Sequence, residues 1–393
     1  MQQLRDRCAI VGTGWTNYSK NSGTSVLSLA LEASKKAIED AGLRAQDIDG
    51  VVTYSLADSV PTNAVATCLG LPQMRYYADL SAGGNVACAA VTKAALAVAS
   101  GMANYVLVYR ALNGSSGIRY AGSDFSRILA TTSIHTDAEQ QFLDPYGILI
   151  PVHHFALMCR RHMVKYGTTT KQLGAVAVTC RGNACLNERA MMRTPMTMED
   201  YEKAPVIAEP FRMFDCCLQS DGACAVVVTS AERAKELKQK PVYIMGAAEG
   251  SGPYGRGGMW GNYWPDHAEC YAKYVAPDLF NMAGVTPRDI DVAEIYDCFT
   301  YSVIVQLEDF GFCKKGEGGA FVEGGRIQLG GELPINTCGG LLSEAYIHGL
   351  NLVVEAVSQL RGDAGSRQVK DAEIALVTAG GAATTGSALI LRR

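Results

Sequence analysis

The sequence lacks the features of a membrane-spanning or exported protein. It has no run of roughly 18 consecutive apolar residues, about the length that an α-helix needs to cross a bilayer. Its start, MQQLRDRCAIVGTGW, has no basic region followed by the long apolar segment of a signal peptide. Charged residues make up 19% and hydrophobic residues 48% of the chain, a composition typical of globular proteins. We therefore expect a soluble, cytoplasmic protein.

Basic clusters are also missing. The chain carries 35 Lys and Arg against 39 Asp and Glu, which gives a formal net charge of −4. Nucleic acids and anionic membranes bind concentrated positive charge, so this balance argues against both as partners. No phosphate-binding loop of the GxxxxGK[ST] type is present either. A small molecule is the partner that the composition favours.

The thirteen cysteines include no CxxC pair. Cys180 and Cys185 are close in sequence, but they lie in a helix-like stretch. Structural zinc sites usually take their thiolates from such closely spaced pairs, so we expect no metal in this chain. We interpret most of the cysteines as small buried hydrophobic residues in a reducing cell.

Short apolar segments alternate with helical patterns, an order that predicts an α/β sheet with crossover helices. The first series predicts strands at 9–14, 50–55 and 105–111 and helices at 25–42 and 88–103. The second predicts helices at 268–284, 299–311 and 340–361 and strands at 293–296, 373–379 and 387–393. The repeated order indicates two halves of similar architecture.

Two similar sequence segments support an internal duplication. The segment AGLRAQDIDGVVTYS begins at Ala41, and AGVTPRDIDVAEIYD begins at Ala283. Each combines a helix-ending glycine, an Asp-Ile-Asp and a strand. A chance match or a common type of helix-to-strand connection would give the same pattern. We favour two related halves, at 1–235 and 236–393.

Two segments interrupt the alternation. Residues from about 112 to 208 have no strand pattern and are predicted to be an insertion of helices and loops. Residues 249–267 combine six glycines with four Trp or Tyr side chains. Glycine supplies mobility and aromatic rings supply apolar contact, so the second segment is either a lid over a ligand or a plain surface loop.

Four turns at predicted strand ends together outline a site. Their sequences are DLSAGGNVACAAVTKAAL at 79–96, EIYDCFTYS at 294–302, INTCGGLLSEAYIHG at 335–349 and VTAGGAATTGSAL at 377–389. The first turn leads into a long helix, whose N-terminal amides favour a developing negative charge. A single Gly-Gly before a helix is weak evidence, so the four turns carry weight only together.

With these turns, essentially the whole chain resembles the thiolase superfamily. Within it the chain is most similar to the sterol-carrier-protein type and to the steroid side-chain retro-aldolases, through AEPFRMFDCCLQSDGACAVVVTSAERAKELKQ and LPINTCGGLLSEAYIHG. A further relative is the large subunit of benzoylsuccinyl-CoA thiolase. The resemblance implies an α/β fold of the thiolase type, a five-layer αβαβα sandwich of two duplicated halves with an inserted loop domain.

The chain departs from the thiolase pattern at every catalytic turn. The acyl-accepting cysteine is replaced by Gly83-Gly84, and the nearest thiol, Cys88, lies inside the helix, where we expect it only to pack. The resemblance places Tyr346 and Tyr296 where thiolases keep proton-transfer residues, and Ala379 where biosynthetic thiolases keep a cysteine. Tyr296 and Tyr346 are therefore our candidate catalytic pair, against the simpler interpretation of two structural tyrosines.

Two carbon–carbon cleavage reactions suit two tyrosines without an acyl-cysteine. Tyrosines can donate hydrogen bonds to an enolate oxygen, and one with a lowered pKa can act as a base. Our main interpretation is a retro-Claisen reaction, in which a bulky β-oxoacyl-CoA and coenzyme A give two acyl-CoAs. The alternative is a retro-aldol reaction that releases a ketone and an acyl-CoA. A non-catalytic acyl-CoA or lipid carrier is a third possibility.

Other residues are assigned supporting roles by the resemblance. Backbone amides of the turns would approach the thioester oxygen or line the facing wall, at Gly83, Gly84, Gly339, Gly340, Gly380 and Gly381. Asn336 is a candidate to orient a water, and Asp297 to support the site or cap the following helix. His348 lies two residues beyond Tyr346 and so on a different helix face, and we favour a packed or supporting histidine over a base. Three aromatic residues are candidates to cover coenzyme A, namely Trp260, Tyr263 and Trp264.

The resemblance also implies partners. Coenzyme A is expected as part of the thioester substrate and product. A homodimer is expected, together with a small DUF35-type subunit carrying an OB-fold and a zinc ribbon, in an α2β2 complex. The zinc would then belong to the partner subunit.

Overall fold

The computed structural model describes residues 4–117, 143–253 and 264–393. The first series of strands and helices follows the predicted alternation, with an additional helix, α2, that the sequence pattern did not indicate. Its elements are β1 (Cys8–Trp15), α1 (Val26–Asp40), β2 (Gly50–Ser55), α2 (Thr62–Leu69), β3 (Tyr76–Ser81), α3 (Ala87–Ala99) and β4 (Tyr105–Asn113).

Helices dominate the described part of the segment that precedes residue 209. They are α6 (Pro151–Tyr166), α7 (Thr170–Cys185) and α8 (Met198–Lys203), followed by the short pair β5 (Val206–Ala208) and β6 (Phe211–Arg212). Alternation then resumes with β7 (Asp221–Ser230), α9 (Ala231–Ala234) and β8 (Val242–Ser251). The last part contains α10 (Ala272–Ala283), β9 (Val292–Glu294), α11 (Thr300–Asp309), α12 (Gly318–Phe321), α13 (Gly340–Ser343), α14 (Leu350–Arg361), β10 (Ile374–Ala379) and β11 (Thr385–Arg392).

Nine strands of the described residues are hydrogen-bonded in the order β3-β2-β4-β7-β1-β8-β11-β10-β9. β1 and β8 pair only at Ala9–Tyr243 and Ile10–Val242, so the sheet divides there into a five-stranded and a four-stranded part. In the first part β2 is parallel to β4, and β4 and β1 are antiparallel to β7. In the second part β9, β10, β11 and β8 repeat these relationships. The boundary at 235/236 stays a prediction.

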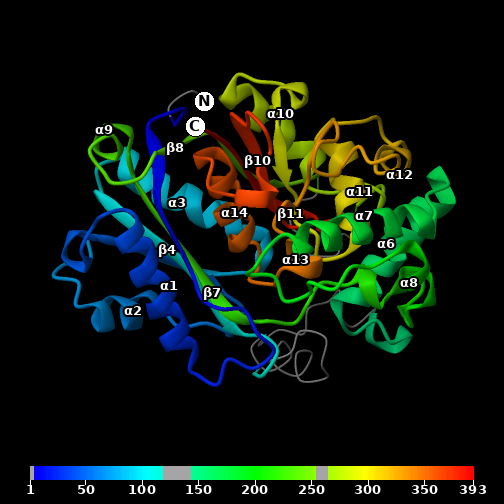
Figure 1. Cartoon of the computed structure of the whole chain (residues 1–393), viewed down its shortest axis with the longest axis horizontal. Helices are drawn as coiled ribbons and strands as arrows, with labels where there is room; N and C mark the ends of the chain where they lie inside the picture. Colours follow the sequence, from blue (N-terminus) through cyan, green and yellow to red (C-terminus); the bar gives the residue numbers. More distant parts are fainter. Residues whose placement is uncertain (1–3, 118–142, 254–263) are drawn as a thin grey trace.

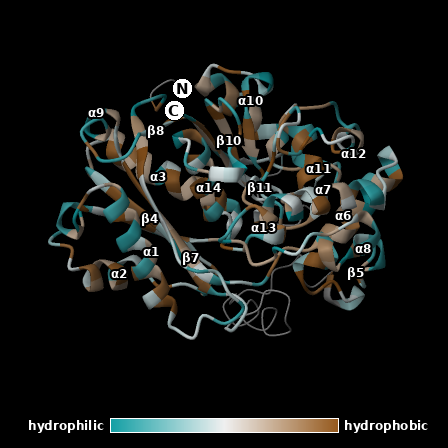
Figure 2. Cartoon of the chain, in the orientation of Figure 1, coloured by the Kyte–Doolittle hydropathy of each residue, from teal (hydrophilic) through white to brown (hydrophobic). Residues whose placement is uncertain are grey.

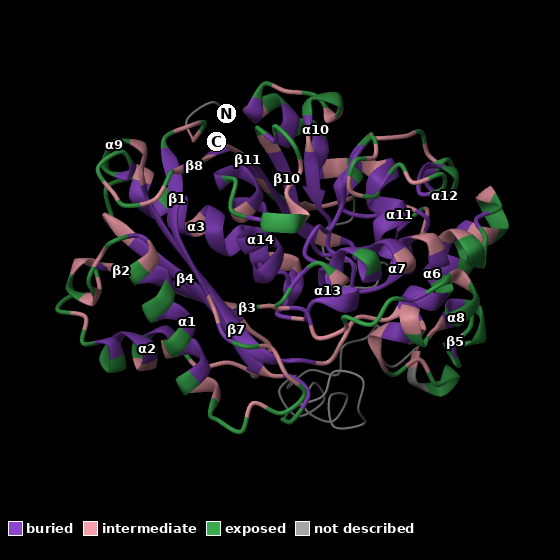
Figure 3. Cartoon of the chain, in the orientation of Figure 1, coloured by how far each residue is buried: buried purple, intermediate pink, exposed green. Residues whose placement is uncertain are grey.

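Two central helices separate the two parts of the sheet. Helices α3 and α14 contact strands of both parts, whereas α1 packs on β1, β7 and β4, and α10 packs on β8 and β11 (Figure 1). The layers therefore run helix, sheet, helix, sheet, helix, and the predicted α/β class is confirmed. In Figure 3 the central helices are almost entirely buried, while α1 and α2 alternate between buried and exposed residues.

Alternate side chains of a strand pack into two different cores, which explains this layering. In β1, Cys8 and Ile10 pack into the core around α3, whereas Ala9 and Val11 pack into a separate core with α1. Successive side chains of a strand point to opposite faces, so a strand covered on both faces is apolar throughout. Figure 2 shows the contrast with α1, where hydrophilic and hydrophobic segments alternate because one face meets water.

The helix predicted over 340–361 is wrong in one respect, because it is two helices. α13 ends at Ser343 and α14 begins at Leu350. Between them His348 and Gly349 have φ angles of 49° and 87°, a left-handed conformation that a right-handed helix does not contain. Separately, none of the helices in the described ranges is both long and apolar enough to span a bilayer.

Candidate active site

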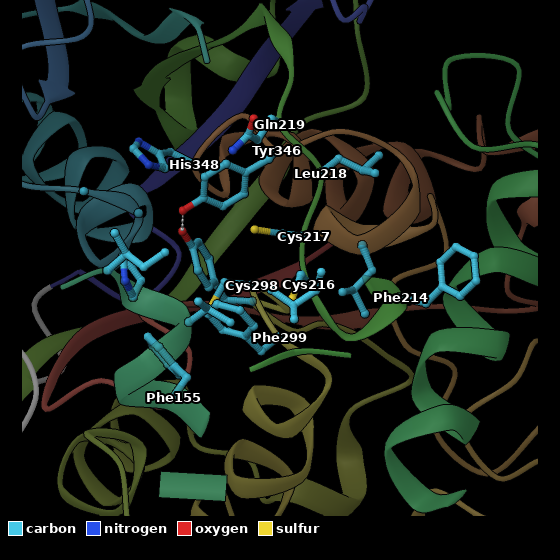
Figure 4. Close-up of a pocket in the computed structure, with 18 of the residues that line it drawn as sticks. Phe155, Phe214, Cys216, Cys217, Leu218, Gln219, Cys298, Phe299, Tyr346 and His348 are labelled. Atoms are coloured by element: carbon cyan, nitrogen blue, oxygen red, sulfur yellow. Dashed lines mark hydrogen bonds between the residues drawn. The ribbon is translucent and has the colours of Figure 1, made fainter. Parts of the chain in front are cut away.

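The four predicted turns meet around one cavity of about 670 Å³ (Figure 4). Gly83 and Gly84 approach it ahead of α3, Tyr296 follows β9, Tyr346 lies between α13 and α14, and Gly380 lies between β10 and β11. A further wall is formed by the segment from Phe214 to Gln219. The strand ends that the sequence placed far apart along the chain therefore converge, as strand ends do in open α/β sheets.

The Tyr296 ring fills the space beside Gly84. A Cβ atom at position 84 would lie 2.6 Å from Tyr296 Cε2 and would overlap the hydroxyl. The ring is fixed on its other side as well, because a Cβ at Gly349 would come within 2.9 Å of Cδ2 and Cε2. Tyr296 therefore needs glycine at both positions, and its hydroxyl stands where a side chain of residue 84 would begin.

The hydroxyl groups of Tyr296 and Tyr346 are 3.0 Å apart and hydrogen-bonded. Their rings meet edge to face at an angle of 70°. The backbone amide of Tyr346 donates to Ser220 Oγ at 3.0 Å, and that of Tyr296 donates to Thr378 Oγ1 at 2.9 Å. The two predicted catalytic residues are thus brought together, and both line the cavity; Figure 4 shows Tyr346 among the other lining residues.

Burial raises the pKa of both tyrosines well above the ordinary value. The hydrogen bond between them lowers the pKa of Tyr296 and raises that of Tyr346, as it does when Tyr346 donates to Tyr296. The lowered pKa that a tyrosinate base requires is therefore not found. At neutral pH the pair consists of two neutral hydroxyls.

His348 is held by a buried arginine. Arg110 Nη2 lies 2.7 Å and Nε 3.2 Å from His348 Nδ1, and Arg110 also forms an ion pair with Asp58. Arginine only donates hydrogen bonds, so Nδ1 must accept and the imidazole proton resides on Nε2. Burial, with Arg110 adding to it, lowers the pKa of His348 to about 3. The neutral ring lies edge to face with Tyr346, with 4.9 Å between ring centroids.

Asn336 and Asp297 bind the backbone instead of facing the cavity. Asn336 accepts from the Ile295 amide at 2.6 Å and donates to the Ile295 carbonyl at 2.8 Å, so its amide group is occupied and the water-orienting role has no support here. Asp297 accepts from the amides of Leu341 and Leu342. It caps α13 rather than the helix that follows it in sequence. Burial raises its pKa to about 7.

The glycines of the turns divide into two groups. Gly83, Gly84 and Gly380 line the cavity. Gly339 and Gly340 instead allow close packing, because Cβ atoms there would lie 2.6 Å from Ala184 Cβ and 2.7 Å from Asn336 Nδ2. Gly381 likewise packs closely, against Cys298. Contact between these last three glycines and a thioester is not supported by the geometry.

The cysteines nearest to the site are not thiolates. Cys88 is fully buried in α3, and its Sγ points to the Val377 carbonyl oxygen at 3.5 Å. Cys217 and Cys298 line the cavity, but burial raises the pKa of Cys298 to about 12 and that of Cys217 well above the ordinary value. Cys338 is buried below α13. The packing role predicted for Cys88 agrees with this position.

The aromatic residues assigned to coenzyme A are mostly outside the described residues. Trp260 and Tyr263 fall in the segment 254–263. Trp264 is buried against Tyr274, with 5.4 Å between ring centroids, and is not among the described residues that line the cavity. Its contact with coenzyme A stays a prediction.

Three charged residues in or behind the site were not predicted from the sequence. Asp58 lies in a loop after β2, Arg110 lies within the apolar strand β4, and Arg181 lies in α7. No local motif marks them. A weak signal was present, since Arg110 interrupts the strand segment YVLVYRA, where a charged residue needs a buried partner.

Comparison with known proteins places the chain among thiolase-like enzymes. Residues 262–393 match the family described as thiolase C-terminal domain-like. The chain is 43% identical to the 17-hydroxy-3-oxo-4-pregnene-20-carboxyl-CoA lyase of Mycobacterium tuberculosis, over 98% of this chain and 99% of the relative. It is 42% identical to a steroid side-chain-cleaving aldolase of Thermomonospora curvata, over 98% of both chains.

A solved structure shares the fold over almost the full length. The Ltp2-ChsH2(DUF35) aldolase aligns with a TM-score of 0.90 and 41% sequence identity, covering 99% of this chain and 98% of that one. The resemblance found in the sequence is thus supported by both sequence and structure.

Proposed function

The chain belongs to the thiolase superfamily, and from this premise we propose that it cleaves a carbon–carbon bond of a bulky β-hydroxyacyl-CoA by a retro-aldol reaction. The products are a ketone or aldehyde and a shorter acyl-CoA. The observation that carries the proposal is the exchange at Gly84, where the Tyr296 hydroxyl takes the place of a nucleophilic side chain. A retro-aldol reaction needs proton transfer but no covalent enzyme intermediate.

The tyrosine pair supplies the proton transfer without a tyrosinate. The substrate's β-hydroxyl gives its proton to one tyrosine oxygen, and that tyrosine passes its own proton across the 3.0 Å hydrogen bond to the other. The second tyrosine then protonates the α-carbon of the enolate that forms when the Cα–Cβ bond breaks. Each tyrosine ends neutral, which accords with the raised pKa of both hydroxyls.

The start of the α3 region is our candidate for holding the thioester oxygen. Gly83 and Gly84 line the cavity ahead of that helix, where backbone amides and the helix dipole favour a developing enolate charge. The remaining lining is largely apolar, with Val152, Phe155 and Phe299 among its residues. Such a lining suits a bulky acyl group, and coenzyme A enters and leaves as its thioester.

The retro-Claisen reaction, our main interpretation of the sequence, has less support than the retro-aldol alternative. It requires a second coenzyme A thiol to attack a β-oxoacyl-CoA, and so a second thiol channel at the cavity. The two relatives above 40% identity are named as a lyase and a side-chain-cleaving aldolase, which supports the retro-aldol reaction and a steroid-like acyl group.

A DUF35-type subunit is the partner that the comparisons favour. The structural neighbour is named as an Ltp2-ChsH2(DUF35) aldolase. We propose that this chain forms a homodimer which binds two such subunits, and that any zinc in the assembly belongs to them.

Turnover of a β-hydroxyacyl-CoA tests the proposed function. The full chain, expressed alone and with a DUF35-type subunit from the same genome, is offered 17-hydroxy-3-oxo-4-pregnene-20-carboxyl-CoA, and the ketone and acyl-CoA products are followed by liquid chromatography with mass spectrometry. We expect both products without added free coenzyme A. A strict requirement for free coenzyme A would contradict the retro-aldol reaction and support the retro-Claisen one. Binding without turnover in either preparation would support a carrier.

A further inference from the structure

Arg181 is a buried arginine at the wall of the cavity. It lies on α7, is 4% exposed, and belongs to the residues that line the cavity. Its Nε donates to Ser343 Oγ at 3.1 Å and its Nη1 to the Thr194 carbonyl at 3.3 Å. The guanidinium also lies over the Phe214 ring, 5.3 Å from its centroid. These contacts fix the orientation of the charged group.

Arg181 differs from other buried arginines because it has no carboxylate partner among the described residues. Arg110 is paired with Asp58, and Arg189 is paired with Glu344 and Glu355. A buried charge without a counter-ion is costly, and burial accordingly lowers the pKa of the Arg181 guanidinium. An arginine kept in such a place is suited to an anion that comes from outside the chain.

One end of the guanidinium remains available for that anion. Nη2 has no hydrogen-bond partner among the described residues and is not fully buried, while Nε and Nη1 are both engaged. The part of the cavity wall that the structure describes contains no Asp or Glu, and its other cation, Lys20, is exposed. The interior of the cavity therefore has positive charge that the described residues do not neutralise.

Arg181 and the tyrosine pair line the same cavity. Ser343, which accepts the hydrogen bond from Arg181, precedes Tyr346 by three residues. The Cα atoms of Ser343 and Tyr346 are therefore at most about 11 Å apart. The neighbouring lining residues Met192, Leu342 and Phe214 are apolar. An anionic group in this position would be held in a largely dry environment, where a charge-assisted hydrogen bond is strong.

We propose that Arg181 binds an oxyanion of the acyl-CoA substrate, either a carboxylate on the acyl chain or a phosphate of coenzyme A. The inference rests on the proposed function, since it takes an acyl-CoA to be the occupant of the cavity. Nη2 donates to the anion, while the Ser343 hydroxyl oxygen accepts from Nε and holds the guanidinium in place. Arg181 thereby sets the position of the substrate relative to Tyr296 and Tyr346.

Binding measurements with matched ligands test the proposal and separate its two sources. Dissociation constants of glutaryl-CoA, pentanoyl-CoA and free coenzyme A are measured by titration calorimetry for the full chain and for Arg181→Met. Glutaryl-CoA and pentanoyl-CoA have acyl chains of equal length and differ in the terminal carboxylate. We expect Arg181→Met to weaken binding about 10- to 100-fold, the usual effect of losing a charged hydrogen bond.

The pattern of the loss identifies the anion. A loss confined to glutaryl-CoA indicates an acyl carboxylate, and an equal loss for all three ligands indicates a coenzyme A phosphate. Wild-type affinity of Arg181→Met for all three would overturn the proposal. If Arg181→Met does not fold, as judged by thermal unfolding, Arg181→Lys keeps the charge with a shorter reach, and unchanged affinities for all three ligands in that variant would overturn it as well.

These measurements are independent of catalysis. Tyr346→Phe removes one of the two hydroxyls that transfer the proton but leaves Arg181 in place. That variant should therefore bind all three ligands as the wild type does. If turnover of the β-hydroxyacyl-CoA fails while the Arg181 effect on binding is present, the proposed reaction is wrong and the oxyanion site stands. If turnover occurs and the Arg181 effect is absent, the oxyanion site is wrong and the reaction stands.

Discussion

The hydroxyl of Tyr296 occupies the space into which a side chain at Gly84 would extend. The Tyr296 ring is 4% exposed and is confined by Gly84 on one side and Gly349 on the other. A nucleophile on residue 84 and a tyrosine at 296 therefore exclude each other sterically. We propose that the change from thiolase chemistry couples the exchanges at these two positions.

Gly84→Ala should displace the Tyr296 ring and abolish turnover. Its Cβ would lie 2.6 Å from Tyr296 Cε2, and overpacking of this kind costs about 1–3 kcal/mol of stability. We expect at least about a hundredfold loss of turnover, since moving a reacting group by about 1 Å costs that much. Turnover of the β-hydroxyacyl-CoA and urea unfolding measure the two effects. Gly182→Ala, at an exposed helical position with open space around it, is the control and should retain activity.

Tyr296→Phe and Tyr346→Phe should each lower turnover by about 10²- to 10⁴-fold, the usual contribution of a general acid or base. Both rings stay, so the fold and ligand affinity should change little. Single-turnover rates and binding constants distinguish the two effects. Tyr301→Phe is a matched control, because the Tyr301 hydroxyl is buried without a hydrogen-bond partner in the described residues. Near wild-type turnover of both Tyr296→Phe and Tyr346→Phe would remove the catalytic assignment.

Cys88→Ala should leave turnover within about twofold of the wild type. The Cys88 thiol is buried in α3 and bonded to the Val377 carbonyl, so its removal deletes packing and not a nucleophile. We expect a stability loss of about 1 kcal/mol, at the small end for a buried large-to-small change. Intact-protein mass spectrometry during turnover should show no acyl adduct on the wild type. An adduct that disappears in Cys88→Ala would indicate thiolase-type catalysis.

The contribution of His348 to the free energy of unfolding should decrease as the pH falls. Its pKa falls from 6.5 to about 3 on folding, so the unfolded chain binds more protons between these values and stability is lost as the pH falls. At pH 5 the loss for this group is about 2 kcal/mol relative to pH 8. Arg110, Asp58 and Tyr346 are the groups that face His348.

The variant His348→Gln isolates the contribution of His348 to the pH dependence of stability. Glutamine cannot titrate but can still accept from Arg110, so the free energy of unfolding at pH 5 minus that at pH 8 should be about 2 kcal/mol more positive in the variant than in the wild type. Asp297, with its pKa raised to about 7, contributes in the opposite direction in both proteins and cancels in the comparison. Equal pH dependence in the two proteins would show that His348 does not carry the effect.

The local pattern predicted most of the strands and the site-forming turns. Apolar segments bounded by glycine mark β2 and β10 because both faces of these strands are covered. The resemblance selected Tyr296 and Tyr346 because each occupies a family position within a recognisable turn. The helix predicted over 340–361 was wrong because His348 and Gly349 adopt left-handed conformations, and both contact residues distant in sequence, namely Arg110 and Tyr296.

Residues outside motifs could not be assigned from the sequence. Asn336 appeared suited to hold a water, but its amide group is hydrogen-bonded to the Ile295 backbone and it is not among the described residues that line the cavity. Asp297 was expected either to support the site or to cap the next helix, and it instead caps α13 from a distance of 44 residues in sequence. Hydrogen bonding of this kind depends on which loops meet, which no local pattern contains.

The sequence by itself determined the alternation of strands and helices and the four turns, because these are properties of short segments. Only the tertiary structure decided which groups share a cavity. Arg110 and His348 are separated by 238 residues, and Tyr296 meets Gly84 across the two halves of the fold. Such contacts are fixed by the packing of both halves around α3 and α14, and so they exist only in the folded chain.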